Sequence, residues 1–144
     1  MQALPHHYTV TATGKAKGSL SICCDGLEDI QVSPPAQFGG PGDEWSPEDL
    51  LMSAVSSCFI FSFRAITAAS KFDWVSIECE ATGVLDKVER SFKFTDVTSV
   101  VKLVIAEGTS VEKAALLLQK AEDSCLINNS LSANCHLEFE IITE

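Results

Sequence analysis

The sequence predicts an α+β fold whose elements follow one another as β-β-β-α-β-β-α-β. Two observations support this prediction. Short segments in which apolar and polar residues alternate, as they do in half-buried strands, occur after a long apolar segment at residues 50–69. That segment and a second one, ending at Ser124, have the character of helices. Internal repeats, low-complexity tracts and linkers are absent, so residues 1–144 are expected to form a single domain with a long central helix.

The first third of the chain has the composition of short strands joined by turns. The expected strands are residues 7–13, 20–24 and 30–32. A turn bounded by glycines, residues 14–18, separates the first two strands. A loop rich in proline and glycine, residues 34–42, then leads to the central helix.

The central helix has a recognisable start. Ser46 is a favoured N-cap residue, Pro47 suits the first helical position, and the next two residues, both acidic, complement the helix dipole. A run of about 20 apolar residues is long enough to span a membrane. Because serine, threonine and arginine side chains interrupt residues 50–69, we instead expect the central helix of a soluble protein, wrapped by a sheet or by a partner.

The second half of the chain is expected to contain strands on both sides of another helix. Residues 74–81 alternate between apolar and polar side chains, and residues 92–94 and 97–105 form one long strand or a pair. Residues 108–124 begin with a turn and continue as a helix with apolar residues at helical spacing. Residues 135–142 alternate again and are the expected last strand.

Charge and the N-terminal segment restrict the partners and the compartment. The chain has 20 acidic and 10 basic residues, a formal net charge of -10, so nucleic acids and anionic membranes are not expected partners. Residues 1–10 lack the apolar core of a signal peptide, and the six cysteines are therefore expected to be reduced thiols in the cytoplasm. The three histidines show no ligand spacing with these cysteines, so neither a metal site nor another cofactor is expected.

Two of the cysteines stand in settings that suggest a working pair. Cys58 lies in the middle of the apolar helix, and Cys125 lies where the second helix stops. Side chains at these two places could meet in space, and the chemistry then favoured is thiol oxidation. A single cysteine is more often a buried core residue than a catalyst, and Cys79 and Cys135, on alternating strands, are expected to be structural.

The surroundings of both cysteines resemble the motifs of a known family. Ser-Pro-Glu-Asp-Leu-Leu at residues 46–51 and Ser-Ser-Cys-Phe at residues 56–59 are similar to the Asn-Pro-Glu-x-Leu and Ala-Ala-Cys-Phe signature of the OsmC/Ohr family. This family comprises osmotically inducible protein C and the organic hydroperoxide resistance proteins. Its second signature, a helix that ends in cysteine before a short turn, is similar to residues 121–130. Strand order, helix order and cysteine placement agree over nearly the whole chain.

The resemblance implies an intertwined homodimer with active sites at its interface. It also implies a thiol peroxidase for organic hydroperoxides, in which Cys58 is the peroxidatic and Cys125 the resolving cysteine. Glu48 matches the glutamate of the family motif, although an acid in the first turn of a helix is equally explained by the helix dipole. The reductant implied by the resemblance is a dithiol or a lipoylated protein.

The sequence departs from the family pattern at one functional residue. The family site also uses an arginine, either in the turn after the first strand or just before the phenylalanine of the loop that precedes the helix. Here the turn has Lys15 and Lys17, and the loop has Gln37 before Phe38. The alternative function is therefore an OsmC-like stress protein or small-ligand-binding protein with weak or no peroxidase activity.

Peroxide reduction needs a thiolate, and a free cysteine has a pKa of about 8.5. Arg64 is six residues beyond Cys58, about 240° around the helix, so it is not expected to face the thiol. Ten residues separate Glu48 from Cys58, which is about 15 Å along a helix. A shared site therefore requires that Glu48 come from the other protomer or that the chain fold back. The neighbouring phenylalanines 59, 61 and 63 are expected to be dimer core more than substrate pocket.

Overall fold

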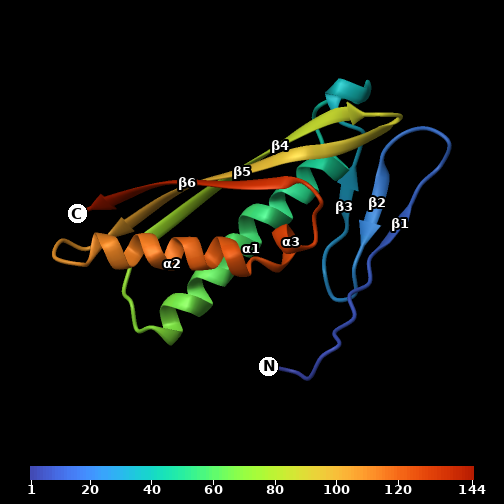
Figure 1. Ribbon diagram of the computed structural model, residues 1–144. Coiled ribbons are helices and arrows are strands. Elements are labelled where there is room, and N and C mark those ends of the chain that lie inside the picture. The colour runs from blue at the N-terminus through green and yellow to red at the C-terminus, as the bar shows by residue number, and fades with distance from the viewer. The chain divides into compact units, whose positions relative to one another are not determined.

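The computed structural model describes all 144 residues and divides into two compact units, Met1–Leu50 and Leu51–Glu144. The elements follow the expected order, with two short helical turns added (Figure 1). The α+β fold class predicted from the sequence is confirmed. That residues 1–144 act as one domain stays a prediction.

The first unit contains a small antiparallel sheet in the order β1-β2-β3. Its strands are β1 (Thr11–Thr13), β2 (Leu20–Cys23) and β3 (Ile30–Val32). The prediction of a first strand at residues 7–13 is wrong at its start, because residues 7–10 have no neighbouring strand to pair with. After β3, the 3-10 helix η1 (Ala36–Phe38) interrupts the proline- and glycine-rich loop.

The long helix α1 (Pro47–Ala69) begins in the first unit. Its start is a reciprocal cap: the Asp49 N–H donates to the Ser46 Oγ at 3.1 Å, and the Ser46 N–H donates to the Asp49 Oδ2 at 3.1 Å. The cap expected from the sequence is confirmed. By length and composition, α1 is the one helix that could cross a membrane.

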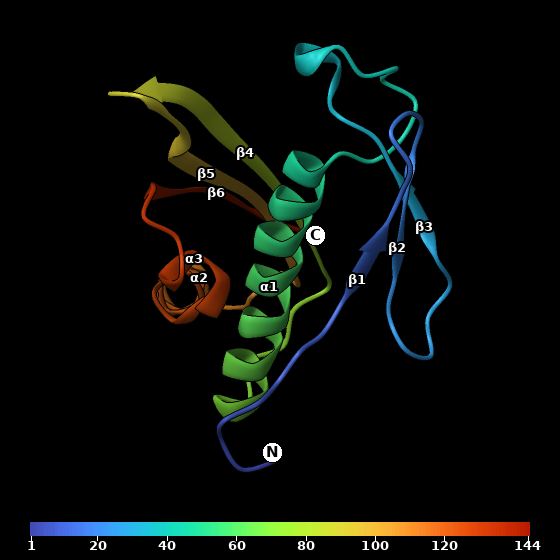
Figure 2. The same cartoon turned by 90° about the vertical axis from the view of Figure 1, so that its right-hand side faces the viewer.

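The second unit contains a sheet in the order β4-β5-β6, with helices on one face of it (Figure 2). Its strands are β4 (Ser76–Val88), β5 (Ser91–Ile105) and β6 (Asn134–Thr143). The helices α2 (Val111–Ser124) and α3 (Leu126–Asn129) connect β5 to β6, which run parallel to each other. A helix between two parallel strands of one sheet is the usual crossover connection.

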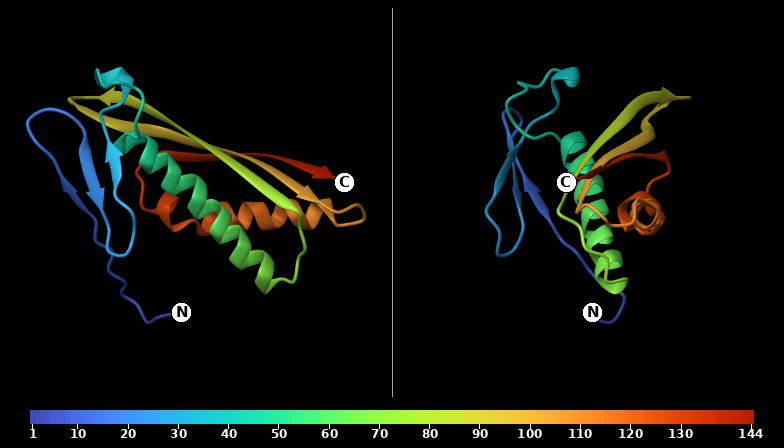
Figure 3. Two further views of the ribbon diagram at one scale, coloured as in Figure 1. Left: turned by 180° about the vertical axis from the view of Figure 1, so that it is seen from behind. Right: turned by 90° about the vertical axis from the view of Figure 1, so that its left-hand side faces the viewer.

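β4 and β5 form a hairpin that is longer than the sequence predicted. β4 continues to Val88 instead of ending near residue 81, and β5 is one strand and not a pair. A β-bulge between Val84 and Leu85 shifts the register and breaks the alternation on which the prediction depended. The hairpin end projects beyond β6, whose first partner on β5 is Asp96 (Figure 3).

The hydrophobic core of the second unit lies between this sheet and its helices. Phe59 and Phe63 are fully buried on α1, where they pack with side chains of β5 and α2. Gly83 allows close packing here, since a Cβ at that position would lie 2.8 Å from the Phe94 ring and 2.9 Å from the Met52 sulfur. The remaining core residues are Val101, Leu103, Ile105, Ala114, Leu117, Leu118 and Ala121.

A thiol pair and two buried carboxyl groups

Cys125 lies at the corner between α2 and α3 and is completely buried. The helix α2 starts at a Ser110 cap and ends when the Cys125 N–H donates to the Glu122 carbonyl at 3.3 Å. The next helix starts at the same residue, because the Asn129 N–H donates to the Cys125 carbonyl at 3.0 Å. Two successive helical turns thus fix the backbone of this cysteine.

The structure brings Cys58 and Cys125 together. Cys58 is half-buried on α1, and its side chain is near enough to the Cys125 thiol to raise the pKa of that thiol. Both are free thiols. Phe59, the residue after Cys58, is fully buried in the core and fixes this face of α1. Two neighbouring free thiols are the arrangement from which a disulfide can form.

The Cys125 thiol is held in its protonated form. The pKa of Cys125 is raised to about 11, chiefly by burial and also by the neighbouring Cys58 thiol, whereas the backbone N–H groups of Asn128 and Ile127 stabilise the thiolate and lower the pKa. At neutral pH the thiolate fraction of Cys125 is accordingly small, on the order of one in ten thousand.

A half-buried carboxyl group, Glu122, lies one turn before Cys125. The Asn128 Nδ2 donates to its Oε1 at 3.2 Å. Burial raises the pKa of Glu122, and the nearby Asp123 charge raises it further. Sequence reasoning missed both Glu122 and Asn128, because a carboxyl and an amide near a helix end have no sequence signal that distinguishes them from surface residues.

Cys79 on β4 and Cys135 on β6 have thiols near Glu122. Burial raises the pKa of Cys79 to about 11, the Ser99 hydroxyl lowers it, and the charges of Glu122 and Cys125 raise it. Burial and Glu122 likewise raise the pKa of Cys135. Both thiols are therefore poor nucleophiles, consistent with the expectation that these cysteines are structural.

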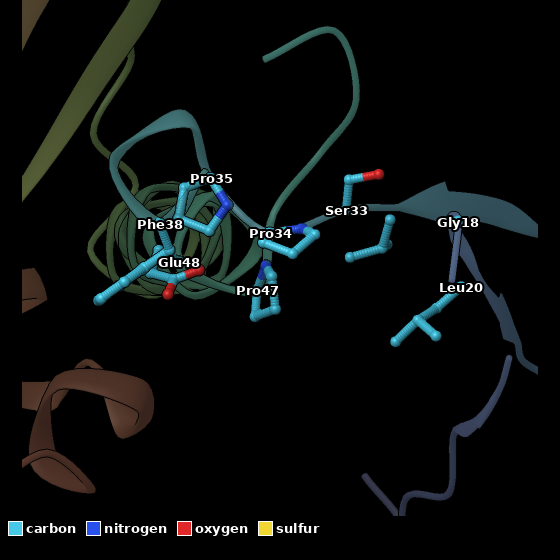
Figure 4. Close-up of a pocket in the computed structure, with 9 residues that line it drawn as sticks. Gly18, Leu20, Ser33, Pro34, Pro35, Phe38, Pro47 and Glu48 are labelled. Carbon is cyan, nitrogen blue, oxygen red and sulfur yellow. The ribbon is translucent and has the colours of Figure 1, made fainter. Parts of the chain in front are cut away.

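Glu48 lies in the first unit, in the first turn of α1, and lines an apolar cavity of about 330 Å³ (Figure 4). Its Oε1 is buried and has no hydrogen-bond partner. The loop beside the cavity is closed by Gly40, whose N–H donates to the Pro35 carbonyl at 3.0 Å. The other residues that line the cavity are Gly18, Leu20, Val32, Ser33, Pro34, Pro35, Phe38 and Pro47.

The proposed substitutes for the family arginine are all exposed residues of the first unit. Lys15 and Lys17 lie in the turn between β1 and β2, and Gln37 lies in η1. None of the three forms a hydrogen bond or ion pair with Glu48. Their role stays a prediction.

The aromatic residues of α1 divide between core and surface. Phe59 and Phe63 are core residues, whereas Phe61 is 62% exposed. Arg64 is exposed and lies over the Phe61 ring, 5.4 Å from its centroid. Arg64 is thus engaged on the surface of the helix, in agreement with the expectation that it does not serve Cys58.

Comparison with known proteins adds a family and its fold. A family model described as "OsmC-like protein" matches residues 40–140. The uncharacterized protein YmaD of Bacillus subtilis is 26% identical over 112 residues, which are 76% of this chain and 75% of that protein. The peroxiredoxin OsmC of Escherichia coli is 26% identical over 96 residues, which are 67% of this chain and 66% of that protein.

Solved structures share the fold over almost the entire chain. An OsmC-like protein of unknown function from Vibrio cholerae superposes with a TM-score of 0.85 at 21% identity, covering 94% of this chain and 100% of that one. The organic hydroperoxide resistance protein OhrB of Bacillus subtilis superposes with a TM-score of 0.68 at 25% identity, covering 94% and 98%.

Proposed function

Because the chain belongs to the OsmC-like protein family, we propose that it is a thiol-dependent peroxidase that reduces organic hydroperoxides. The observation that carries the proposal is the proximity of the Cys58 and Cys125 side chains at the buried end of α2. Names of similar proteins, a peroxiredoxin and an organic hydroperoxide resistance protein, support the same substrate class.

The reaction runs in three balanced steps. The Cys58 thiol releases its proton, and the thiolate attacks the outer oxygen of the hydroperoxide, so that an S–O bond forms and the O–O bond breaks. The alkoxide takes up one proton and leaves as the alcohol. The sulfur gives up two electrons and becomes a sulfenic acid. The Cys125 thiol then attacks that sulfur, so that an S–S bond forms and water leaves. A dithiol or lipoylated-protein reductant restores both thiols by exchange.

The two cysteines differ in the ways that these roles require. Cys58 is half-buried and therefore open to a substrate, whereas Cys125 is fully buried and open only to its neighbour. With a pKa of about 11, Cys125 stays a thiol and does not compete for peroxide until Cys58 has been oxidised. We assign Cys58 as the peroxidatic residue and Cys125 as the resolving residue.

A homodimer in which Glu48 of one protomer completes the site of the other is part of the proposal. Large apolar side chains support an interface, since Phe61 and Leu116 are 62% and 65% exposed.

The test mixes two variants, E48Q and C58S. If Glu48 acts across the interface, the mixed dimer has one intact site and regains activity. If both residues act within one chain, every site keeps one defect and the mixture stays inactive.

The compartment and the reductant complete the proposal. Free thiols and a net charge of -10 suit a cytoplasmic protein that acts on small molecules and binds neither nucleic acid nor membrane. Each turnover leaves one disulfide, and a dithiol suits its reduction because the second thiol–disulfide exchange is then intramolecular. Activity with dihydrolipoamide but not with a monothiol is the expected result.

A second candidate function is a small-ligand-binding or stress protein with weak peroxidase activity. It is favoured by the unpartnered Glu48 oxygen in an apolar cavity that has no cation among its lining residues. Placing arginine in the family positions tests it, through K17R and Q37R. A gain in peroxidase activity in either variant would show that the missing guanidinium limits the reaction.

The deciding experiment measures thiol loss after one equivalent of cumene hydroperoxide, with the disulfide mapped by peptide mass spectrometry. Loss of two thiols, mapped to Cys58 and Cys125, is the expected result. C58S should lose none, and C23S is the matched control because Cys23 lies on β2, in the other unit. Survival of all six thiols in excess peroxide would exclude the peroxidase and leave the second candidate.

A further inference from the structure

Glu122 and Asn128 form a pair of side chains that spans the Cys125 corner. The amide of Asn128 donates to the Glu122 Oε1 at 3.2 Å. The second oxygens of the same two groups, Glu122 Oε2 and Asn128 Oδ1, are both buried and have no hydrogen-bond partner. Two unpartnered acceptors in one contact are costly, because each loses its bonds to water without replacement.

A single proton on Glu122 removes both defects. A carboxylic acid and a carboxamide are planar groups that each present a donor beside an acceptor. If Glu122 is neutral, its O–H donates to the Asn128 Oδ1 while the Asn128 amide donates to the Glu122 Oε1. The ring of two hydrogen bonds then leaves no buried oxygen unpartnered.

The surroundings of Glu122 favour the neutral form. Burial raises the pKa of Glu122, and Asp123 on the same helix raises it further, whereas the hydrogen bond from Asn128 and the charge of His136 lower it. His136 on β6 already pairs with Asp96 at 3.0 Å. The thiols that face Glu122 from the sheet, Cys79 and Cys135, are uncharged at neutral pH. The C-terminal end of α2, where Glu122 lies, disfavours negative charge.

We propose that Glu122 carries a proton in the resting protein and, as an acid–amide pair with Asn128, positions Cys125 against Cys58. The positioning role deepens the proposed disulfide cycle and rests on it, whereas the protonation of Glu122 does not. Glu122 is a positioning residue, because it acts through Asn128 and touches neither substrate nor the reacting sulfur.

The backbone shows how the pair acts on the sulfur. The Asn128 backbone N–H stabilises the Cys125 thiolate and so lowers the pKa of that thiol, and the Cys125 N–H donates to the Glu122 carbonyl. Asn128 is 6% exposed, so its side chain and its backbone N–H are fixed together. Closing the side-chain ring therefore holds the N–H aimed at the sulfur and keeps the sulfur on the side of Cys58.

The protonation of Glu122 is tested by infrared difference spectroscopy of the full-length protein at neutral pH. The wild type minus E122Q spectrum is expected to show the C=O stretching band of a neutral carboxylic acid. E112Q is the matched control, because Glu112 is exposed on the same helix, and the band of the neutral acid should remain in the spectrum of that variant. Carboxylate bands alone in the E122Q difference spectrum would overturn the proposal.

The positioning role is tested with diamide, an oxidant that takes two electrons and two protons from a dithiol without any peroxidase step. We measure the rate at which the Cys58–Cys125 disulfide forms. E122A and N128A are expected to slow it by about tenfold, the equivalent of one to two lost hydrogen bonds. E122Q is expected to keep the wild-type rate, because glutamine forms the same ring with Asn128 at any pH.

The pH profile separates positioning from a general structural effect. As pH rises, the rate ratio of E122Q to wild type should rise from about one, since only the wild type loses its ring when Glu122 ionises. A flat ratio, or an E122A protein that is folded by circular dichroism and forms the disulfide at the wild-type rate, would overturn the positioning role. Normal disulfide formation with diamide but none with peroxide would instead remove only the proposed peroxidase.

Discussion

Two half-buried carboxyl groups, Glu48 and Glu122, lie at opposite kinds of helix end and in opposite surroundings. Glu48 is in the first turn of α1, where the helix dipole favours a negative charge. Glu122 is in the last turn of α2, where the dipole disfavours one. Each has one buried oxygen without a partner. The same residue type thus stands at opposite ends of a helix dipole, in each case with one buried oxygen that lacks a partner.

The neighbours strengthen this difference. The cavity that Glu48 lines offers mainly proline, leucine, valine and phenylalanine side chains, so an incoming ligand or protein group must supply the missing donor. Glu122 instead has its own partner, Asn128, across the Cys125 corner. The Glu122 carboxyl group thus has a hydrogen-bond donor within its own unit, whereas the buried Oε1 of Glu48 has none.

The largest expected effect is the loss of peroxidase activity when either cysteine of the Cys58–Cys125 pair is replaced. C58S should reduce hydroperoxide consumption to the background rate, because no other thiol has both exposure and a partner thiol in contact. C125S should still consume one equivalent of peroxide and then stop, with Cys58 trapped as a sulfenic acid that dimedone labels. The measurement is peroxide consumption per protomer. Continued turnover by C58S would exclude the assigned roles.

The next largest effect concerns the hydrophobic core of the second unit, the unit that contains Glu122. F59A should destabilise the protein by about 3–5 kcal/mol, since Phe59 is fully buried beside Cys58 in the core of the second unit. Urea unfolding monitored by circular dichroism measures this loss.

F61A is the matched control for F59A. Phe61 is 62% exposed, so its truncation should leave the core intact and weaken self-association instead. Sedimentation at a series of protein concentrations measures that change. Equal loss of unfolding free energy in both variants would contradict the division of α1 into a core face and a surface face.

A smaller effect on stability is expected from a substitution in the loop beside the cavity that Glu48 lines. A Cβ added at Gly40 would lie 1.7 Å from the Pro34 carbonyl oxygen, so G40A must displace the loop beside the cavity, at a cost of about 3 kcal/mol. G26A is the control: its φ of +78° strains an alanine by about 1 kcal/mol, but nothing lies within 4 Å. Thermal unfolding compares the two variants, and equal melting temperatures would argue against the close approach.

Much of the fold could be predicted from the sequence because the signals were local. The Ser46 cap and the end of α2 before Cys125 depend on residues within one helical turn, and both predictions are confirmed. The extent of the hairpin was not predictable in this way. Val84 and Leu85 pair with β5 across a bulge, and a bulge changes which residues face the core without leaving a signal in composition.

The residues of the candidate site also divide into those that the sequence predicts and those that only the folded structure identifies. Cys58 and Cys125 could be paired from their places on two helices, and the structure brings them into contact. Glu122 and Asn128 escaped prediction because a carboxyl and an amide near a helix end are common surface residues. Their role follows only from burial and from the two unpartnered oxygens, which are properties of the folded chain.

The smallest expected effect sharpens the comparison through pH. The pKa of Glu122 is raised on folding, so the folded state binds its proton more tightly than the unfolded chain does. The unfolding free energy of the wild type should therefore fall as pH rises through the interval between the unfolded and the folded pKa. E122Q removes this titration, and the stability difference between the two proteins should shift in favour of E122Q over that interval. Urea titrations at a series of pH values measure the difference, and parallel stability curves for wild type and E122Q would show that Glu122 is ionised in the folded protein as readily as in the unfolded chain.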